Sequence, residues 1–507
     1  MRSPLHQRTL LLGVTGSIAA FKAAALASML TKEGARVITL LTPSATRFIT
    51  PLTFQALTGQ KAYTQDDLWG PEGHILHVDL ARQADAMLIV PCTAETLAQL
   101  AQGHGNTLVS LAALALDRKR TPLLLAPAMD AGMFAHPAVQ EHLARLKQQG
   151  THILGPVYGR LASGLVAQGR MVEPEDIVNY LRLLFARQGP LQGRHVVVTA
   201  GPTREPLDPV RVFTNRSSGK QGYALAEAAR DLGARVTLIS GPTQLPAPYG
   251  VERISVETAR EMYQVLMEVL PETDILLKVA AVADYRPAQQ ATEKVKKGRK
   301  RWTVTLEANP DLLQAVQAYR EEHGRPRWVV GFAAESRLDA ALARQKLEAK
   351  GLDLLLLNDI TRPDAGFAVD TNQGILLDRD GHQQTFPVMS KRRVADLILA
   401  WVLYFEQERQ LCHVLPWEAW LQVRDRGTLD TASMAHHGRL ALARPDQLAR
   451  WVARRYPHLS RENLMVLTLD AREWTGRWSW VWEHGEWWPY LHVQEPIPVH
   501  RLHASPF

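Results

Sequence analysis

Cysteine is almost absent from this chain, which has only Cys92 and Cys412 among its 507 residues. Two thiols cannot form a disulfide framework or a four-thiolate zinc site, and both are compatible with a reducing compartment. Long hydrophobic runs are also absent, because no apolar stretch reaches the roughly 18 residues that a membrane-spanning helix needs. The start, Met1 to Leu12, lacks the apolar core and cleavage site of a signal peptide. We therefore expect a globular, cytoplasmic protein without a membrane partner.

Lysine is missing after Lys391, whereas residues 401–507 hold ten of the thirteen tryptophans. This change in composition predicts a separate C-terminal module. The net charge of +7 suits an enzyme that handles phosphorylated substrates, and it equally suits weak contact with nucleic acid. A nucleic-acid-binding third module would be basic and rich in lysine, so the missing lysines argue against nucleic acid as a partner.

Strand-like apolar runs alternate with helical stretches over the first 405 residues. Residues 9–42 predict a strand, a helix and a second strand, and this unit extends into a parallel sheet covered by helices. A polar, turn-prone segment at 186–194 precedes a second such pattern, with later strands expected at 234–240, 274–279, 328–332 and 353–357 and a closing helix over 391–405. We predict an α/β protein with two doubly wound parallel-sheet domains, 1–189 and 190–405, and a small α+β domain, 406–507.

The first strand is followed by Gly13 to Ile18, a turn that places small residues and free amide groups at a helix N-terminus. A phosphate is favoured at such a position by the helix dipole. The dinucleotide fingerprint G-x-G-x-x-G fails, because Thr15 stands where the second glycine would be. Taken alone, the turn fits a phosphate site and a plain strand-to-helix connection about equally well.

Five further motifs follow this turn in order: Gly73-His74-Ile75, Pro91-Cys92-Thr93-Ala94, GHGNTLVS at 103–110, Pro127-Ala128-Met129-Asp130 and Gly169-Arg170-Met171. Together they resemble the flavin-dependent cysteine decarboxylase family. The resemblance implies a flavodoxin-like domain whose FMN takes hydride from a cysteinyl side chain, so that the resulting thioaldehyde accepts the electrons released with carbon dioxide. It also implies that His74 acts in the first step. The implied cofactor-binding residues are Gly16, Ser17, Thr42, Thr93 and Ala94.

Two candidate catalytic positions depart from this family's pattern. The family motif P-A-M-N, whose asparagine holds the substrate carboxylate, reads P-A-M-D, so Asp130 brings a negative charge and lacks the amide donor. The flap cysteine that donates a proton to the enethiol intermediate is replaced by Ser163, a far weaker acid. The first domain is therefore expected to bind flavin, either as a decarboxylase or as a degenerate scaffold for oligomerisation.

A long loop at 200–222, rich in glycine and serine, connects the first strand and helix of the second domain. Such a loop can wrap a phosphate, and Ser218-Gly219-Lys220 invites comparison with a P-loop. Thr214 stands in place of the first P-loop glycine and Gln221 in place of its hydroxyl residue, which excludes the P-loop.

Six more motifs follow this loop: AAVADY at 280–285, EKVKK at 293–297, NPD at 309–311, GFAAE at 331–335, Lys346 with Lys350, and Asn358-Asp359. With the loop they resemble the phosphopantothenate–cysteine ligase family of coenzyme A biosynthesis. The resemblance implies that a carboxylate attacks the α-phosphate of CTP, giving an acyl-cytidylate and pyrophosphate, and that the amine of cysteine then displaces CMP. Lysines and a magnesium ion held by an aspartate are the usual means of stabilising the charge on the phosphates.

The resemblance also implies roles for individual residues. Asp284 would help hold the metal and the triphosphate, Lys294 would contact the transferring phosphate, and Asn215 would handle the acyl-cytidylate. The implied nucleotide-binding residues are Ala280, Asp284, Lys294, Asn309, Pro310, Asp311, Leu312, Phe332, Lys346 and Lys350. Taken singly, Lys294 also fits a solvated basic face, and Lys346 with Lys350 fits a surface pair. Lys278, inside an apolar run, either lies at a strand end near the nucleotide or extends to solvent.

The C-terminal residues resemble a small uncharacterised bacterial domain related in fold to ADP-ribosyltransferases, through Cys412-His413-Val414, Trp482-Glu483, Pro489 to His492 and Pro496 to Pro498. The histidines at 413, 436, 437 and 492 lack zinc-finger spacing, and structural roles are favoured for them. The tryptophans are expected in the core rather than on a base-stacking surface. Family precedent implies a homo-oligomer. The competing class is a non-enzymatic scaffold, which predicts degraded triphosphate motifs that the sequence does not have.

Overall fold

The computed structural model describes residues 3–70, 75–296, 302–335, 338–361, 364–366, 368–430, 434, 438–474, 478–493 and 495–507. The chain divides into two compact units, Arg2–Phe185 and Ala186–Phe507. Within the ranges just given, no helix combines the length and apolar character needed to cross a bilayer.

The first unit is built on a six-stranded sheet in the order β3-β2-β1-β4-β5-β6, in which every neighbouring pair is parallel. The strands are β1 (Thr9–Val14), β2 (Arg36–Leu41), β3 (Ala62–Tyr63), β4 (Ala86–Cys92), β5 (Leu123–Pro127) and β6 (His152–Ile153). Successive side chains of a strand point to opposite faces, so Leu10 and Leu12 join one hydrophobic cluster and Leu11 joins another. The predicted doubly wound α/β fold is confirmed for this unit.

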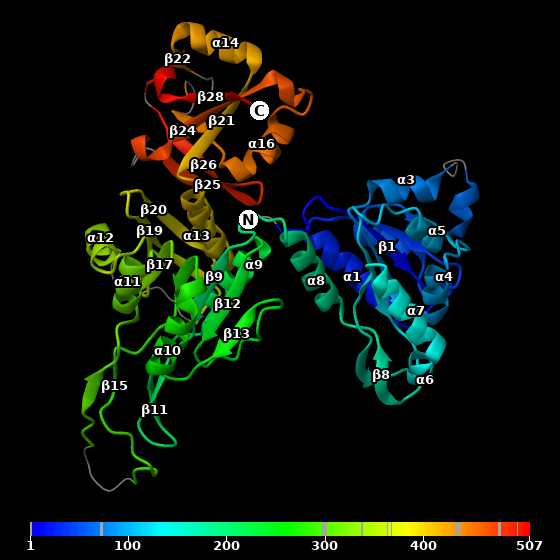
Figure 1. Ribbon diagram of the computed structural model, residues 1–507, viewed down its shortest axis with the longest axis horizontal. Coiled ribbons are helices and arrows are strands. Elements are labelled where there is room, and N and C mark those ends of the chain that lie inside the picture. Colours follow the sequence, from blue (N-terminus) through cyan, green and yellow to red (C-terminus); the bar gives the residue numbers. More distant parts are fainter. Residues whose placement is uncertain are drawn as a thin grey trace. The chain divides into compact units, whose positions relative to one another are not determined.

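Helices cover both faces of this sheet (Figure 1). One face carries α1 (Ala20–Lys32), α2 (Pro51–Thr58) and α8 (Pro174–Ala186), and the other carries α3 (Leu76–Gln83), α4 (Ala94–Gln102), α5 (Leu108–Leu114) and α7 (Pro137–Gln148). The short helix α6 (Ala131–Ala135) and an antiparallel ribbon, β7 (Val157–Arg160) with β8 (Val166–Arg170), follow β5 along the chain. Strand order reverses between β1 and β4, and α/β proteins bind ligands beyond the carboxyl ends of the strands at such a point.

The second unit contains an eight-stranded sheet in the order β13-β12-β9-β14-β17-β18-β19-β20. Its strands are β9 (His195–Ala200), β12 (Arg235–Ser240), β13 (Glu252–Ser255), β14 (Ile275–Lys278), β17 (Trp328–Glu335), β18 (Leu354–Asp359), β19 (Thr371–Asp378) and β20 (Gln383–Ser390). The first six strands in this order are parallel, as predicted. Strands β19 and β20 are antiparallel to their neighbours, and the sequence analysis did not predict them. The connection from β19 to β20 is too short for a crossover, which forces a hairpin.

Five helices flank this sheet: α9 (Lys220–Asp231), α10 (Ala259–Val269), α11 (Leu312–His323), α12 (Ala340–Ala349) and α13 (Lys391–Glu406). The helix predicted over 391–405 is α13. Two ribbons, β10 (Arg204–Pro206) with β11 (Val212–Thr214) and β15 (Tyr285–Pro287) with β16 (Leu306–Ala308), extend away from the sheet (Figure 1). Strand order reverses between β9 and β14, which places a second ligand-binding crevice at their carboxyl ends.

The C-terminal residues form small antiparallel sheets. Their strands are β21 (Gln410–Pro416), β22 (Thr428–Leu429), β23 (Arg439–Ala441), β24 (Leu464–Asp470), β25 (Trp478–Glu483), β26 (Glu486–His492), β27 (Ile497–Pro498) and β28 (His503–Pro506), beside α14 (Trp417–Arg426) and α16 (Leu448–Arg455). Most tryptophans here are buried, which confirms their predicted place in the core; these are Trp401, Trp420, Trp451, Trp474, Trp478, Trp480, Trp487 and Trp488.

Helix α13 lies at the centre of the second unit. Thirteen of its sixteen residues are buried, so it is covered on nearly every side rather than along one stripe. One hydrophobic cluster contains residues of the eight-stranded sheet, of α13 and of the C-terminal strands. The ring of Trp401 lies 5.7 Å from that of Trp478 and 6.1 Å from that of Trp480, measured between centroids. The division at residue 405 stays a prediction, because the compact unit includes both sides of it.

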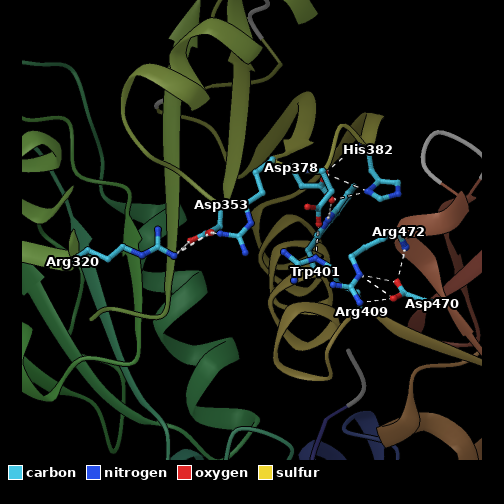
Figure 2. A network of polar contacts seen from close by, with 10 residues as sticks. Arg320, Asp353, Asp378, His382, Trp401, Arg409, Asp470 and Arg472 are labelled. Atoms are coloured by element: carbon cyan, nitrogen blue, oxygen red, sulfur yellow. Dashed lines mark hydrogen bonds and ion pairs between the residues drawn. The ribbon is translucent and has the colours of Figure 1, made fainter. Parts of the chain in front are cut away.

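Polar contacts accompany this apolar junction (Figure 2). Asp378, at the end of β19, is fully buried and accepts hydrogen bonds from the Trp401 indole at 3.0 Å and from the main chain of His382 at 2.9 Å. Gln384 of β20 donates to the Trp480 carbonyl and accepts from the Trp480 amide, each at 2.8 Å. These directional bonds fix the position of β25 against β20, which packing alone would not do.

Candidate functional site

The predicted flavin-binding residues gather at the carboxyl edge of the first sheet. Gly16 and Ser17 follow β1, Thr42 follows β2, and Thr93 and Ala94 follow β4, so all five lie at the ends of three adjacent strands. This edge includes the β1–β4 reversal point. The structure therefore brings together the whole predicted cofactor set.

Contacts at this edge explain why the turn after β1 contains Thr15 and Gly16. A Cβ atom on Gly16 would lie 2.5 Å from the Ser44 side chain, so only glycine fits there. The buried Thr15 hydroxyl donates to the Pro91 carbonyl at 2.7 Å and accepts from the Thr93 amide at 3.2 Å. Thr15, which breaks the dinucleotide fingerprint, thus joins the turn after β1 to the turn after β4.

A cavity of about 440 Å³ opens beside this edge, and its walls include Ser17, Lys22, Asp130, Ser163 and Arg170. The two residues that depart from the family pattern meet in its wall, where the Ser163 hydroxyl donates to the Asp130 carboxylate at 2.6 Å. This bond, with a second from the Gly132 amide at 3.2 Å, holds the pKa of Asp130 below its ordinary value. Asp130 is therefore an anion at neutral pH. His74 lies outside the described residues.

Sequence reasoning missed the positive charge of this cavity. The Lys22 ammonium lies 2.9 Å from the Glu173 carboxylate, and Arg170 contacts the same carboxylate. Lys22 belongs to α1, whereas Arg170 ends β8 of the ribbon and Glu173 follows it, so no local motif joins them. Two cations that share one acid leave a net positive charge in the wall of the cavity that Asp130 also lines.

Two adjoining cavities lie at the carboxyl edge of the second sheet. The loop cavity, of about 440 Å³, is lined by residues 215–222, residues 278–282 and Lys391. The helix cavity, of about 600 Å³, is lined by residues 308–313, Lys346 and Lys350. Both are lined by Lys278, Val282, Asp284, Phe332, Ala333 and Ala334, which form their common boundary.

Most of the predicted ligase residues line one of these cavities. Those in the helix cavity are Asp284, Asn309, Pro310, Asp311, Leu312, Phe332, Lys346 and Lys350, and those in the loop cavity include Asn215 and Ala280. Lys294 lines neither cavity. It lies on the exposed connection between β15 and β16, where its neighbour Val295 donates a main-chain hydrogen bond to Asp208 at 3.2 Å. The structure does not bring Lys294 to the other candidates.

The helix cavity is held open by capping bonds and ion pairs. Asp311 accepts from the amides of Leu313 and Gln314 at the start of α11, and its carboxylate pairs with Lys350. Lys346 pairs with Glu335 at the end of β17. Lys346 lies in the last turn of α12 and Lys350 is the residue just after this helix. Both ammonium groups are partly exposed, so each can exchange its carboxylate for a phosphate.

Lys278 ends β14 at the boundary of the two cavities. Its ammonium donates to the Ala280 carbonyl at 3.4 Å, and no carboxylate in the described part of the chain forms an ion pair with it. Burial lowers the pKa of Lys278, and the carboxylates of Asp311 and Asp284 act in the opposite direction. Of the two alternatives for Lys278, this geometry favours a position at a strand end near the expected nucleotide over a side chain that extends to solvent.

The predicted metal position is a single carboxylate. Within the described ranges no group of three or more histidine, cysteine or acidic side chains could hold a metal ion. Asp284 makes no side-chain hydrogen bond or ion pair with the residues that the structure describes, and it faces both cavities. One carboxylate completed by phosphate oxygens and water is an ordinary way to bind magnesium, so the site suits a metal that arrives with a nucleotide.

Two known families match the first unit and the second unit as far as residue 405. Residues 2–185 match the family described as Flavoprotein, and residues 191–405 match the family described as DNA/pantothenate metabolism flavoprotein C-terminal domain. The chain is 44% identical over 398 residues to the coenzyme A biosynthesis bifunctional protein CoaBC of Bacillus subtilis, which covers 78% of this chain and 96% of that protein. It is 40% identical over 413 residues to the Escherichia coli protein of the same name, with 80% and 100% covered.

Among solved structures, the C-terminal domain of a coenzyme A biosynthesis bifunctional protein CoaBC is 35% identical, covers 43% of this chain and 99% of that chain, and has a TM-score of 0.37. The identity over most of the chain confirms the predicted bifunctional decarboxylase and ligase of coenzyme A biosynthesis. The chain belongs to the family of the coenzyme A biosynthesis bifunctional proteins CoaBC.

Proposed function

We propose that the second domain, 190–405, joins 4'-phosphopantothenate to cysteine with CTP through an acyl-cytidylate, and that the first domain, 1–189, uses FMN to decarboxylate the product to 4'-phosphopantetheine. The observation that carries the ligase assignment is the convergence of Asp284, Phe332 and Lys346 on two adjoining cavities. Magnesium, a homo-oligomeric state and a cytoplasmic location belong to the same proposal. The exposed Ile18 and Phe21, 62% and 64% accessible beside the first cavity, favour an oligomer.

In the ligase half, the nucleotide occupies the helix cavity, with its outer phosphates on Lys346 and Lys350 and its metal on Asp284. The acid occupies the loop cavity, so its carboxylate meets the α-phosphate at the shared boundary, beside Lys278. Asn215 donates its side-chain amide to the carbonyls of Ala281 and Val282, at 3.1 and 3.2 Å. We expect one of these bonds to be exchanged for the developing oxyanion.

In the first domain, the residues present fit a flavin phosphate, because Ser17, Thr93 and Ala94 lie at the carboxyl ends of adjacent strands, just before or at the starts of α1 and α4. Gly16 allows this turn to pass close to Ser44. When bound, FMN would act as the acceptor of the hydride from the cysteinyl side chain. Lys22 and Arg170 provide positive charge for the substrate carboxylate, whereas the Asp130 anion opposes it. Ser163 is placed to orient Asp130, and its hydroxyl is a poor proton donor.

The test supplies the full-length protein with 4'-phosphopantothenate, cysteine, CTP and magnesium and identifies the products by mass spectrometry. Formation of CMP with phosphopantetheine is expected if both halves turn over. Accumulation of phosphopantothenoylcysteine would support the ligase with an inactive first domain, the alternative that Asp130 and Ser163 leave open. Absence of both CMP and the cysteine conjugate would contradict the proposal.

Replacing Lys278 with methionine should slow pyrophosphate release from CTP and 4'-phosphopantothenate by about 10- to 100-fold, because the change removes a partly buried cation beside the reacting phosphate. Arg235→Met is the matched control, since Arg235 begins β12 at the opposite edge of the same sheet. A coupled pyrophosphate assay measures both variants. Equal turnover in Lys278→Met and Arg235→Met would exclude a role for Lys278 in the chemical step.

A further inference from the structure

A further cavity, of about 200 Å³, lies in the C-terminal part of the second unit. Helix α16 supplies one side of this α16 cavity, and strands of the sheet β23-β26-β25 supply the other. All the residues that line it follow residue 405, where the match to the family of the ligase domain ends. The α16 cavity therefore lies outside the ligase residues described above and calls for its own explanation.

Aromatic side chains form the apolar walls of the α16 cavity. Trp451 of α16 and Trp488 of β26 are 7% and 4% exposed, with their ring centroids 5.7 Å apart. Tyr490 lies two residues after Trp488, so the two side chains point to the same face of β26. Ala441 of β23 pairs with Tyr490, and its short side chain leaves space at this wall. Since an apolar cavity of roughly 150 Å³ can hold benzene, there is room here for one aromatic ring with a small substituent.

Hydrogen bonds hold these walls in place. The Trp488 indole donates to the Glu483 carbonyl at 3.2 Å, and the Tyr490 hydroxyl donates to the Glu483 carboxylate at 2.8 Å. On β23, the Ala441 carbonyl accepts a hydrogen bond from the buried His413 ring at 2.9 Å. The cavity thus has its shape before a ligand arrives, which lowers the conformational entropy that binding would cost.

The charged side chains of the α16 cavity do not balance. Arg454 and Arg455 line it from the last turn of α16, and Glu483 is the only acid among the described residues of its wall. Arg454 donates to the His484 ring, and the Arg455 guanidinium lies 5.6 Å from the centre of the Trp451 ring. No carboxylate in the described part of the chain forms an ion pair with either arginine.

The end of α16 does not neutralise the two arginines. A helix C-terminus carries only about half a negative charge, whereas Arg454 and Arg455 carry two full positive charges. A guanidinium group binds a carboxylate or a phosphate through two parallel N–H bonds, and it also stacks on aromatic rings. An anion at this end of the cavity would therefore be stabilised by both arginines.

We propose that the α16 cavity binds a small aromatic anion, whose ring lies against Trp488 and Tyr490 and whose negative group lies on Arg454 and Arg455. Carboxylate and phosphate both suit a guanidinium group, so the ligand class is defined by a ring and a negative charge together. The site is separate from the cavities of the proposed ligase and does not depend on that function.

The first experiment measures Kd values for small probes by ligand-observed NMR with the full-length protein and saturating CTP, which occupies the proposed ligase site. The probes are benzoate and phenyl phosphate, their uncharged counterparts benzamide and phenol, and their ringless counterparts acetate and inorganic phosphate. The two aromatic anions should bind at least about tenfold more tightly than the other four, because only they make both the charge-assisted bonds and the apolar contact. Benzoate against phenyl phosphate shows which negative group the site prefers.

The second experiment assigns the binding to the cavity. Arg455→Met should raise the Kd of both aromatic anions by about 10-fold and leave that of benzamide within about twofold, because it removes one charge-assisted bond. Arg461→Met is the matched control, since Arg461 is also exposed and lies 5.4 Å from the centre of the Phe507 ring, outside the cavity. Ala441→Leu should abolish binding of every ring-bearing probe by filling the space, and thermal unfolding shows whether each variant is folded.

Several results would overturn the proposal. Equal Kd values for the aromatic anions and their uncharged counterparts would show that the arginines bind no anion. Equal values for the ring-bearing and ringless anions would reduce the site to a surface contact. An equal loss of binding in Arg455→Met and Arg461→Met would place it elsewhere, and the absence of saturable binding of both aromatic anions to the wild-type protein would also exclude it.

Discussion

Replacing Asp284 with asparagine should reduce ligase turnover by about 10³-fold, the upper range for loss of one preorganised electrostatic group. The substitution keeps the size of the side chain and removes the negative charge that faces both ligase cavities. It should also raise the magnesium concentration needed for half-maximal rate, because only phosphate oxygens and water would remain as ligands of the proposed metal. CMP formation followed across a magnesium titration measures both effects.

Decarboxylation supplies the internal control for Asp284→Asn. Phosphopantothenoylcysteine added directly should be converted at the wild-type rate, because Asp284 belongs to the second compact unit and the flavin-type cavity to the first. A parallel loss of both activities would indicate misfolding. Ligase turnover within about tenfold of wild type would show that Asp284 does not hold the metal.

The double variant Asp130→Asn/Ser163→Cys should form phosphopantetheine from phosphopantothenoylcysteine about 10²-fold faster than wild type. The asparagine removes an anion and restores an amide donor for the substrate carboxylate, and the thiol is a far better proton donor than a hydroxyl. The rate is measured by mass spectrometry of the product under anaerobic conditions, with ligation in the same preparation as the control.

The single variants show whether the two positions act together. Ser163 donates to Asp130 in the native chain, so each single change weakens the same hydrogen bond, and the effects of the two changes should not add. If the wild-type rate of phosphopantetheine formation already equals that of the double variant, Asp130 and Ser163 support decarboxylation as well as asparagine and cysteine do at these positions. No gain in the double variant would exclude both residues as the limiting feature.

Much of the fold could be predicted because the parallel strands are buried on both faces. A strand such as β9, buried along its whole length, must be apolar throughout, and that run is visible in the sequence. The hairpin β19–β20 was missed because β20 is a sheet edge with exposed positions, polar residues and Pro387. An edge strand of this kind is hard to distinguish from a loop by periodicity.

The residues of the candidate sites likewise include some that could be predicted from the sequence and others that could not. Asp284 and Phe332 were predicted from the family resemblance, and the fold agrees, because one motif follows β14, the other ends β17, and the carboxyl ends of these neighbouring strands meet. The place of Lys391 in the wall of the loop cavity could not be predicted, because it depends on the packing of α13 against α9, 171 residues earlier along the chain. The contact between Ser163 and Asp130 likewise joins a flap to a strand end. Lys294 was chosen from its motif alone, and its local sequence says nothing of the distance between that ribbon and the cavities.

The burial of α13 bears on whether the C-terminal residues can be removed from this chain. They pack on Trp401 and Tyr404, which would meet water if residues 410–507 were absent. The segment after α13 is therefore an integral part of the second unit rather than a detachable appendage, and a shortened chain would carry a bare aromatic surface on that helix.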